Sequence, residues 1–274
     1  MEYSGRVAWI TGASSGIGAA LARDLAGRGA HLILSGRDKE RLAAVARDCG
    51  KTLILAFDVR DEAALADATK RAIDWKGGVD LAFANAGVSQ RSRALRTDFK
   101  VYRDIIEIDL TAPIAFSQGL IGPMVERASK GHSGALVFIS SIAGKVGIPM
   151  RTAYSAAKFG LAGYGDALRA ELSQTGVGVH MVYPGSVATD VARNALNAGG
   201  EARGRSDKVI DGGIPADEAA SRMLDAIAAG SREIIIARGG ELALGEARRT
   251  PEALFDQMAD TVAKGYMDRM EEDE

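Results

Sequence analysis

Tyr154 and Lys158 stand four residues apart in a stretch with helical spacing, so their side chains share one face of a helix. A tyrosine phenol has a pKa of about 10, too high for ready proton exchange at neutral pH. A neighbouring ammonium group favours the phenolate and lowers that pKa. Such a pair therefore has the chemistry for proton transfer near neutral pH.

A glycine-rich turn supplies a second kind of chemistry. The first apolar run passes directly into TGASSGIG at residues 11–18, and a helical pattern follows. Glycines in such a turn let backbone amides approach a pyrophosphate, and the helix N-terminus adds free N–H groups and partial positive charge. The predicted phosphate-binding residues are Gly12, Ser14, Ser15, Gly16, Ile17 and Gly18.

These features together resemble the classical short-chain dehydrogenases/reductases. TGASSGIG is similar to the TGxxxGxG fingerprint of that family, and further motifs follow in family order. They are Asp58-Val59, Ala84-Asn85-Ala86-Gly87, Ser140-Ser141, Tyr154–Lys158 (YSAAK) and Pro184–Thr189 (PGSVAT). The resemblance implies a single Rossmann-like domain and reversible hydride transfer between a nicotinamide cofactor and an alcohol or carbonyl.

The resemblance also implies the catalytic roles. Tyr154 is expected to be the general acid/base and Lys158 its partner, which also binds the nicotinamide ribose. Ser141 precedes Tyr154 by thirteen residues, the family spacing, and its hydroxyl can hold the substrate oxygen near the tyrosine. Ser140 is the alternative, but we expect it to face the fold.

Asp109 departs from the family pattern, because many members carry an asparagine at this position. In the family, that residue helps to hold a water of a proton relay to the lysine, largely through its backbone carbonyl. A carboxylate adds charge and donates no hydrogen bond when ionised. We expect Asp109 to take part in catalysis, and two alternatives stay open: it pairs with Lys158 through water, or it slows the relay.

The residues after the second predicted strand favour NADP(H), with NAD(H) as the alternative. NAD-selective members carry an acidic residue here for the ribose 2′-hydroxyl, but spacing from Gly18 places Gly36 at that position. The next residue, Arg37, can pair bidentately with a 2′-phosphate. Asp38 is interpreted as a helix N-cap.

The remaining cofactor contacts are assigned by resemblance, and for each the alternative is a short structural turn. All follow predicted strands, where open α/β sheets bind ligands. They are Asp58 and Val59 beside the adenine, Asn85, Ala86 and Gly87 along the fourth strand, and Pro184, Gly185, Val187 and Thr189 towards the nicotinamide.

The elements that must position these residues alternate between strand and helix. Apolar runs that lack polar alternation predict strands buried on both faces, and therefore a doubly wound α/β sheet of about seven parallel strands with helices on both faces. The runs are Val7–Thr11, His31–Ser35, Thr52–Phe57, Val79–Ala84, Ala135–Ser140, Val177–Tyr183 and Glu233–Ala237. Helical patterns cover Ala19–Arg28, Asp38–Cys49, Glu62–Trp75, Ala153–Gln174 and Ala216–Ala229.

We expect one domain over residues 1–274, with two segments outside the alternation. Val191–Pro215 is either a mobile lid over a pocket or a long surface excursion. A helical extension covers about 238–274, where apolar residues recur every four positions: Leu254, Met258, Val262, Tyr266 and Met270. This stripe predicts packing against the same domain or a second subunit, with lateral membrane attachment as the alternative.

Composition excludes several other classes of protein. Lys plus Arg is 34 and Asp plus Glu is 36, so nothing favours nucleic acid as a partner. The single cysteine and three scattered histidines predict no disulfide and no metal site. No signal peptide or membrane span is expected, and the prediction is a cytoplasmic protein. The resemblance implies a homo-oligomer, a dimer or tetramer.

The substrate is expected to be a small-molecule carbonyl or alcohol. Residues 143–150, AGKVGIPM, are mostly apolar, and 140–160 look like the steroid- and lipid-handling members, so the prediction is a lipophilic ketone or secondary alcohol. Arg91, Arg93 and Arg96 either bind an anionic group or form a solvated loop, which we favour. Two alternatives to an enzyme stay open: a cofactor-binding regulator with impaired catalysis, and a structural subunit.

Overall fold

A seven-stranded parallel sheet forms the centre of the computed structural model, which describes residues 2–272. The strand order β3-β2-β1-β4-β5-β6-β9 reverses direction between β1 and β4, and this reversal creates the crevice where doubly wound sheets bind ligands. The strands are β1 (Val7–Thr11), β2 (His31–Gly36), β3 (Thr52–Ala56), β4 (Leu81–Ala84), β5 (Gly134–Ile139), β6 (Val177–Pro184) and β9 (Glu233–Ile236). The predicted fold class and all seven strands are confirmed.

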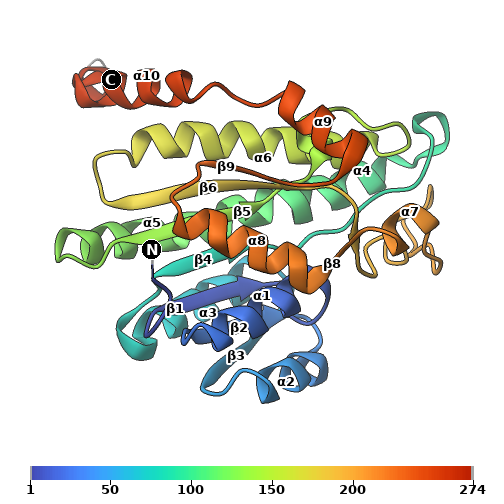
Figure 1. Ribbon diagram of the computed structural model, residues 1–274, viewed down its shortest axis with the longest axis horizontal. Coiled ribbons are helices and arrows are strands. Elements are labelled where there is room, and N and C mark those ends of the chain that lie inside the picture. The colour runs from blue at the N-terminus through green and yellow to red at the C-terminus, as the bar shows by residue number, and fades with distance from the viewer. Residues whose placement is uncertain (1, 273–274) are drawn as a thin grey trace.

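Helices cover both faces of this sheet (Figure 1). One face carries α1 (Gly16–Gly27), α2 (Lys39–Arg47) and α8 (Ala216–Ala228). The other carries α3 (Glu62–Asp74), α5 (Ala112–Ser129) and α6 (Thr152–Glu171). Alternate residues of each strand supply the two cores, as with Ile10 on one side and Trp9 on the other.

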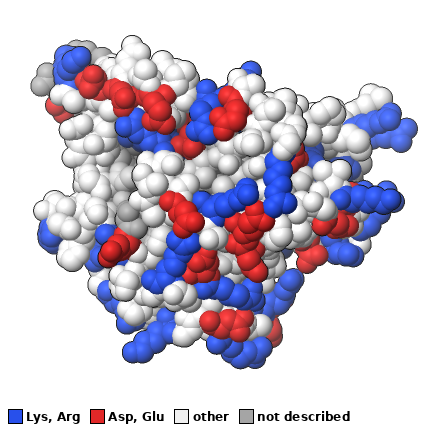
Figure 2. All heavy atoms as spheres, in the orientation of Figure 1, with Lys and Arg blue, Asp and Glu red and all other residues white. Residues whose placement is uncertain are grey.

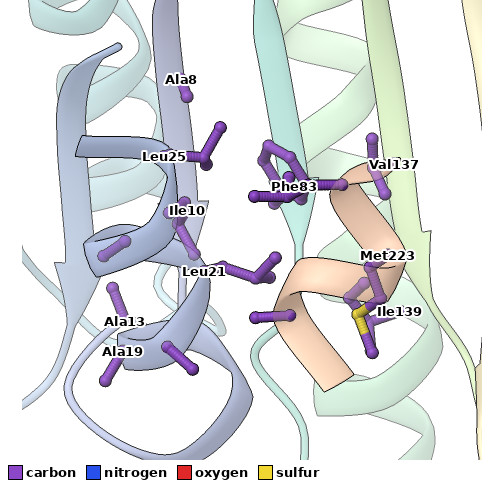
Figure 3. Close-up of a cluster of buried hydrophobic side chains, with 14 of the residues drawn as sticks. Ala8, Ile10, Ala13, Ala19, Leu21, Leu25, Phe83, Val137, Ile139 and Met223 are labelled. Atoms are coloured by element: carbon purple, nitrogen blue, oxygen red, sulfur yellow. The ribbon is translucent and has the colours of Figure 1, made fainter. Parts of the chain in front are cut away.

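The first core fills the space between α1, α8 and the middle strands (Figure 3). Leu21 and Leu25 of α1 and Met223 of α8 pack with Phe83 of β4, and all four are fully buried. Burying a side chain of this size contributes about 1.5–3 kcal/mol. This packing fixes α1 against the sheet and so fixes the turn that leads into it.

The segment after β4 forms one long helical run over 99–129. It comprises α4 (Phe99–Ile106), a π-helical turn (Glu107–Thr111) and α5. Its length and composition alone would allow a membrane span. In this fold Phe116, Leu120 and Met124 belong to the second core. The π-helical turn matters for the site, because such turns are frequent at functional positions.

Val191–Pro215 is a structured excursion at the carboxyl edge of the sheet (Figure 1). It contains α7 (Lys208–Asp211), and its end, β8 (Ile214–Pro215), pairs with β7 (Val187–Ala188). Leu196 exchanges backbone hydrogen bonds with Ser89 and Arg91. The excursion is therefore anchored to the loop that follows β4.

The C-terminal extension differs from the predicted continuous stripe. It forms α9 (Gly239–Ala247), α10 (Glu252–Ala263) and α11 (Tyr266–Glu272), with Gly265 at φ +75° between the last two. Leu254, Met258 and Tyr266 are exposed. The buried contact is Phe255, which lies under the guanidinium groups of Arg169 and Arg232. The side chain of Met270 lies outside the described part of the chain.

Basic and acidic side chains are interspersed over the face of the molecule shown in Figure 2. Exposed charged side chains of the described residues form ion pairs, such as Arg238 with Glu218 at 2.6 Å and Arg232 with Asp256 at 2.6 Å. Exposed pairs of this kind contribute little, about 0–1 kcal/mol each. The exposed pairs therefore do little to hold the fold together.

Candidate active site

The ends of β1 and β4 are tied together where the strand order reverses. The buried Thr11 hydroxyl accepts hydrogen bonds from the backbone N–H groups of Asn85 and Ala86 at 3.0 and 3.1 Å. The Asn85 amide in turn donates to the carbonyl of Thr11 at 2.9 Å and to that of Gly12 at 3.3 Å. The Asn85 side chain thus braces the glycine-rich turn from the neighbouring strand.

The glycine-rich turn requires its glycines for close approach. Gly12 has φ +65°, and a Cβ atom there would lie 2.8 Å from Cα of Ala86. At Gly18 a Cβ atom would lie 2.3 Å from the Gly12 carbonyl oxygen. The Ser15 side chain makes no capping hydrogen bond to α1, so the N–H groups of the first turn are left for another acceptor. This is the donor set that fits a pyrophosphate.

Beside this turn lies an open hollow of about 550 Å³. Ser14, Ser15 and Gly16 line it on one side and Thr189 on the other, so the PGSVAT segment faces the glycine-rich turn. A Cβ atom at Gly16 would approach the Thr189 methyl group to 3.1 Å. The two motifs thus meet in space although they are far apart in the chain.

The end of β2 carries the residues expected to select the cofactor. A Cβ atom at Gly36 would fit in ordinary van der Waals contact, 3.6 Å from Oγ of Ser14 and 3.6 Å from a methyl carbon of Leu42. Arg37 is exposed and forms no ion pair within residues 2–272. Asp38 caps α2 by accepting from the Arg41 N–H at 2.9 Å, as predicted. A hydroxyl and an unpaired guanidinium therefore flank a position without an acidic side chain.

Asp58 and Val59 follow β3 on the same edge. The Asp58 carboxylate accepts two hydrogen bonds from the Arg60 guanidinium, at 2.8 and 3.1 Å, and one from the Arg60 backbone N–H at 3.0 Å. These bonds hold the pKa of Asp58 below its ordinary value, and the charge of Arg37 acts in the same direction. Val59 and Ala86 line a small, mainly apolar pocket with Ile108.

The residues predicted to carry acid–base chemistry lie near the carboxyl ends of β5 and β6, where Lys158 donates to the carbonyl of Ile139 and Ser141 to that of Pro184. Tyr154 and Lys158 share a face of α6, with Nζ of Lys158 5.6 Å from the centre of the tyrosine ring. Ser141 follows β5, and its hydroxyl accepts from the Ala143 N–H at 3.1 Å. Ser140 is buried and donates to the carbonyl oxygen of Lys158 at 3.2 Å. Ser141 is thus the more accessible serine of the two.

Asp109 lies in the π-helical turn and pairs directly with Lys158. Its Oδ2 lies 3.3 Å from Nζ of Lys158, and its Oδ1 accepts from the Val88 N–H at 2.8 Å. Both side chains are buried, and Lys158 also donates to the Ile139 carbonyl at 3.0 Å. Gly87 leaves room for the pair, since a Cβ atom there would lie 3.3 Å from Asp109 Oδ2. The water-mediated alternative is therefore replaced by a direct ion pair.

Burial and charge act in opposite directions on this pair. Burial lowers the pKa of Lys158. The charges of Asp109 and Tyr154 together raise it by more than burial lowers it, so the pKa of Lys158 lies above its ordinary value. Burial also raises the pKa of Asp109, against the influence of Lys158 and of the Val88 N–H. The carboxylate thus keeps the buried lysine in its ammonium form, and the two groups titrate as a unit.

Sequence reasoning missed Glu241, which holds the PGSVAT segment. Glu241 in the first turn of α9 accepts from the backbone N–H of Ser186 at 2.7 Å and from its hydroxyl at 2.8 Å. At Gly185 a Cβ atom would lie 2.4 Å from Glu241 Oε2, so this contact requires glycine. No local pattern marks the contact, because the partners are 55 residues apart in the chain.

Lys145, in the mostly apolar segment 143–150, pairs with a buried carboxylate. Its Nζ lies 2.5 Å from Glu233 Oε2 on β9 and 4.4 Å from the ring centre of Tyr183. It also donates to the Arg248 carbonyl at 3.2 Å. Lys145 and Glu233 are buried, and they join the loop after Ser141 to the C-terminal extension.

Known proteins of one family are similar to this chain. Residues 6–199 match the family described as short chain dehydrogenase. A dehydrogenase/reductase SDR family member 7B from Danio rerio is 35% identical over 85% of this chain and 77% of its own length. The protein of the same name from Xenopus laevis is 34% identical over 83% of this chain and 72% of its own length.

Two solved structures share the fold. A short chain dehydrogenase/reductase from Burkholderia phymatum in complex with NAD superposes with a TM-score of 0.76 at 22% identity, covering 86% of this chain and 90% of that one. An alcohol dehydrogenase from Thermococcus sibiricus complexed with 5-hydroxy-NADP gives 0.72 at 22% identity, covering 85% and 96%.

Proposed function

Because this chain belongs to the short-chain dehydrogenase/reductase family of oxidoreductases, we propose that it interconverts a ketone and a secondary alcohol with NADP(H). The observation that carries the proposal is the pairing of Tyr154 with Lys158 on α6, against which the short turn capped by Ser141 packs, at the sheet edge that also carries the glycine-rich turn. The test is NADPH consumption by the full chain over ketones of several classes, with NADH in parallel.

Each residue of this group has a distinct task. When bound, the nicotinamide supplies or accepts the hydride. The Ser141 hydroxyl donates a hydrogen bond to the substrate oxygen and holds it at the Tyr154 hydroxyl. Tyr154 donates its proton to that oxygen during reduction and accepts it during oxidation. The Lys158 ammonium stabilises the phenolate, and Asp109 holds that ammonium in place at 3.3 Å.

Preference for NADP(H) follows from the end of β2. The unpaired Arg37 guanidinium and the Ser14 hydroxyl flank the space over Gly36, which suits a 2′-phosphate. An acidic side chain in that space would instead accept from a ribose hydroxyl, and this chain has none at that position. The preference is therefore assigned to Arg37, supported by Ser14.

Replacing Arg37 tests this preference. Arg37→Ala is expected to weaken NADPH binding by about tenfold to a hundredfold, because a charge-assisted hydrogen bond contributes about 1.5–3 kcal/mol. NADH binding should change by less than about threefold, since NADH has no 2′-phosphate for the guanidinium to bind. Calorimetric titration with both cofactors measures the two effects. Equal losses for NADPH and NADH would contradict the assignment.

Replacing Glu241 tests how the PGSVAT segment is held. Glu241→Ala removes both acceptors from Ser186, so the segment loses its fixed position opposite the glycine-rich turn. We expect the KM for NADPH to rise by about tenfold, since hydrogen bonds to a charged group contribute about 1.5–3 kcal/mol. Ser186→Ala is the matched control: it keeps the bond from the backbone N–H and should cost less. An unchanged KM in Glu241→Ala would leave the carboxylate with a purely structural role.

The substrate proposed for this site is a lipophilic ketone or alcohol. Apolar residues of 143–150 follow Ser141, and Met150 stands with φ +64° and an exposed side chain shortly before Tyr154. Backbone strain of this kind collects where a structure shapes a site. The loop therefore offers an apolar wall next to the acid–base pair.

We also propose that the protein is cytoplasmic and forms a homo-oligomer. Phe99 and Ile106 on α4 and Phe159 on α6 expose apolar side chains, and α4 and α6 pack against each other. Exposed apolar side chains on neighbouring helices favour burial against another surface. A second copy of this chain is the partner proposed for them.

A further inference from the structure

Three arginines from separate segments gather around one carboxylate at the carboxyl edge of the sheet. Arg91 lies in the loop after β4, Arg151 directly precedes α6, and Arg203 lies in the excursion. Asp207, the N-cap of α7, is 3.5 Å from Nη2 of Arg91 and 3.4 Å from Nη1 of Arg203. Two guanidinium groups thus pair with one carboxylate, and the charge of Arg151 acts on both Asp207 and Arg91.

Arg91 is buried to an extent unusual for a loop arginine. Its side chain is 10% exposed, and its guanidinium donates to the Ser89 hydroxyl and the Gln90 carbonyl, both at 3.0 Å. The favoured expectation of a solvated loop is therefore wrong for Arg91, although Arg93 and Arg96 are exposed. The alternative of an anion-binding residue survives for Arg91.

Asp207 neutralises this cluster incompletely. Its distances to Arg91 and Arg203 exceed the 2.7–2.9 Å or so of a tight charge-assisted bond. Its Oδ1 also accepts from the Ile210 N–H at 3.0 Å. Burial lowers the pKa of Arg91, and the positive charges of Arg151 and Arg203 act in the same direction. An added anion would relieve this repulsion.

Hydrogen bonds join the loop that carries Arg91 to the start of α6, the helix that carries Tyr154. The buried Gln90 accepts from the Ala153 N–H at 2.8 Å, and Met150 accepts from the Ser92 N–H at 3.1 Å. Arg151 precedes Tyr154 by three residues, which is about one helical turn, or about 5 Å along the axis. Its side chain has no hydrogen-bond or ion-pair partner within residues 2–272. A ligand held at Tyr154 is therefore within reach of Arg151.

We propose that Arg91, Arg151 and Arg203 form an anion-binding subsite for the substrate. The inference rests on the proposed function and narrows it: the substrate is a lipophilic ketone or alcohol that also carries an oxyanion group, a carboxylate or a phosphate. The guanidinium groups bind that group bidentately and so orient the reacting carbon towards Tyr154. The subsite is separate from Arg37, which follows a different strand.

Matched pairs of substrates test the subsite. Keto carboxylic acids of increasing chain length are compared with their methyl esters, and keto phosphate monoesters form a second arm. Wild type is expected to favour the acid over its ester by at least about tenfold in kcat/KM. Arg151→Gln should lower kcat/KM for the acid about tenfold more than for the ester, mainly through KM. Arg93→Gln, an exposed arginine in the same loop, should keep the preference.

Calorimetry keeps this test independent of turnover. The keto acid is titrated into wild type, Arg151→Gln and Arg93→Gln, each with and without NADPH. Binding lost only in Arg151→Gln supports the subsite even if no ketone is reduced, and in that case the proposed function alone fails. Equal kcat/KM for acid and ester in wild type, or equal binding to all three proteins, overturns the subsite while leaving the reductase intact.

Discussion

Tyr154→Phe is expected to lower kcat for ketone reduction by about a thousandfold, with little change in the affinity for NADPH. The variant lacks the hydroxyl that exchanges a proton with the substrate oxygen, and general acid–base catalysis contributes about 10²–10⁴ in rate. The ring stays in place beside Lys158, because its contact with the ammonium group is made by the ring face, 5.6 Å from Nζ. Steady-state NADPH consumption and calorimetric titration measure the two quantities.

The matched control for this variant is Tyr102→Phe. Tyr102 also carries a hydroxyl near the start of α6, where it hydrogen-bonds to Thr152 at 2.8 Å, but it is not part of the acid–base group. Its kcat is expected to stay within about twofold of wild type, as for most surface changes. Retained turnover in Tyr154→Phe would exclude Tyr154 as the general acid. Normal function in cells without turnover would favour the alternative of a cofactor-binding regulator.

The sheet and the phosphate-binding turn could be predicted because their signals are local. Strands buried on both faces appear as continuous apolar runs, and Gly12 and Gly18 are required by contacts within the turn itself or with the adjacent strand. Hydrophobic periodicity does not predict the bounds of the long helical run over 99–129. Pro113 and Pro123 and the π-helical turn interrupt the period that marks a helix.

The remaining features depend on contacts between distant segments. Glu241 with Ser186 and Lys145 with Glu233 pair across the fold, and neither partner carries a local signature. The C-terminal stripe shows that a correct local pattern can still predict the wrong buried residues. Its period is correct for a helix, but Gly265 divides it, and the residue buried against the domain is Phe255, which lies outside the stripe. Helical periodicity predicts which residues share one face of a helix, whereas the burial of that face depends on the segments that pack against it.

Replacing Asp109 is expected to produce the second large effect. Asp109→Ala leaves the Lys158 ammonium buried without its counter-charge, and breaking a buried ion pair in this way costs about 3–5 kcal/mol of unfolding free energy. We expect a lower Tm and a loss of at least about a hundredfold in kcat. Chemical denaturation and steady-state kinetics measure the two effects.

Asp109→Asn keeps the shape of the side chain but removes its charge, so it tests the role of the charge with less effect on folding. The carboxylate accepts from the Val88 N–H through Oδ1 and forms an ion pair with Lys158 through Oδ2, but an amide has one oxygen, so either the Val88 N–H or the Lys158 ammonium then faces an NH₂ group. An unmet buried donor costs about 1–3 kcal/mol. We therefore expect a folded, less stable variant with about a tenth of the wild-type kcat.

The pH profile distinguishes an electrostatic role of Asp109 from a structural one. The raised pKa of Lys158 means that its contribution to stability is complete below the unfolded lysine value of about 10.4 and is lost as pH rises through the higher folded value. Without the carboxylate, burial lowers the pKa of Lys158, so the alkaline fall in kcat should begin at lower pH in Asp109→Asn than in wild type. If kcat falls at the same alkaline pH in Asp109→Asn and in wild type, Asp109 only supports packing. A rise in kcat above wild type would mean that the ion pair restrains the proton relay, the property expected of a regulator.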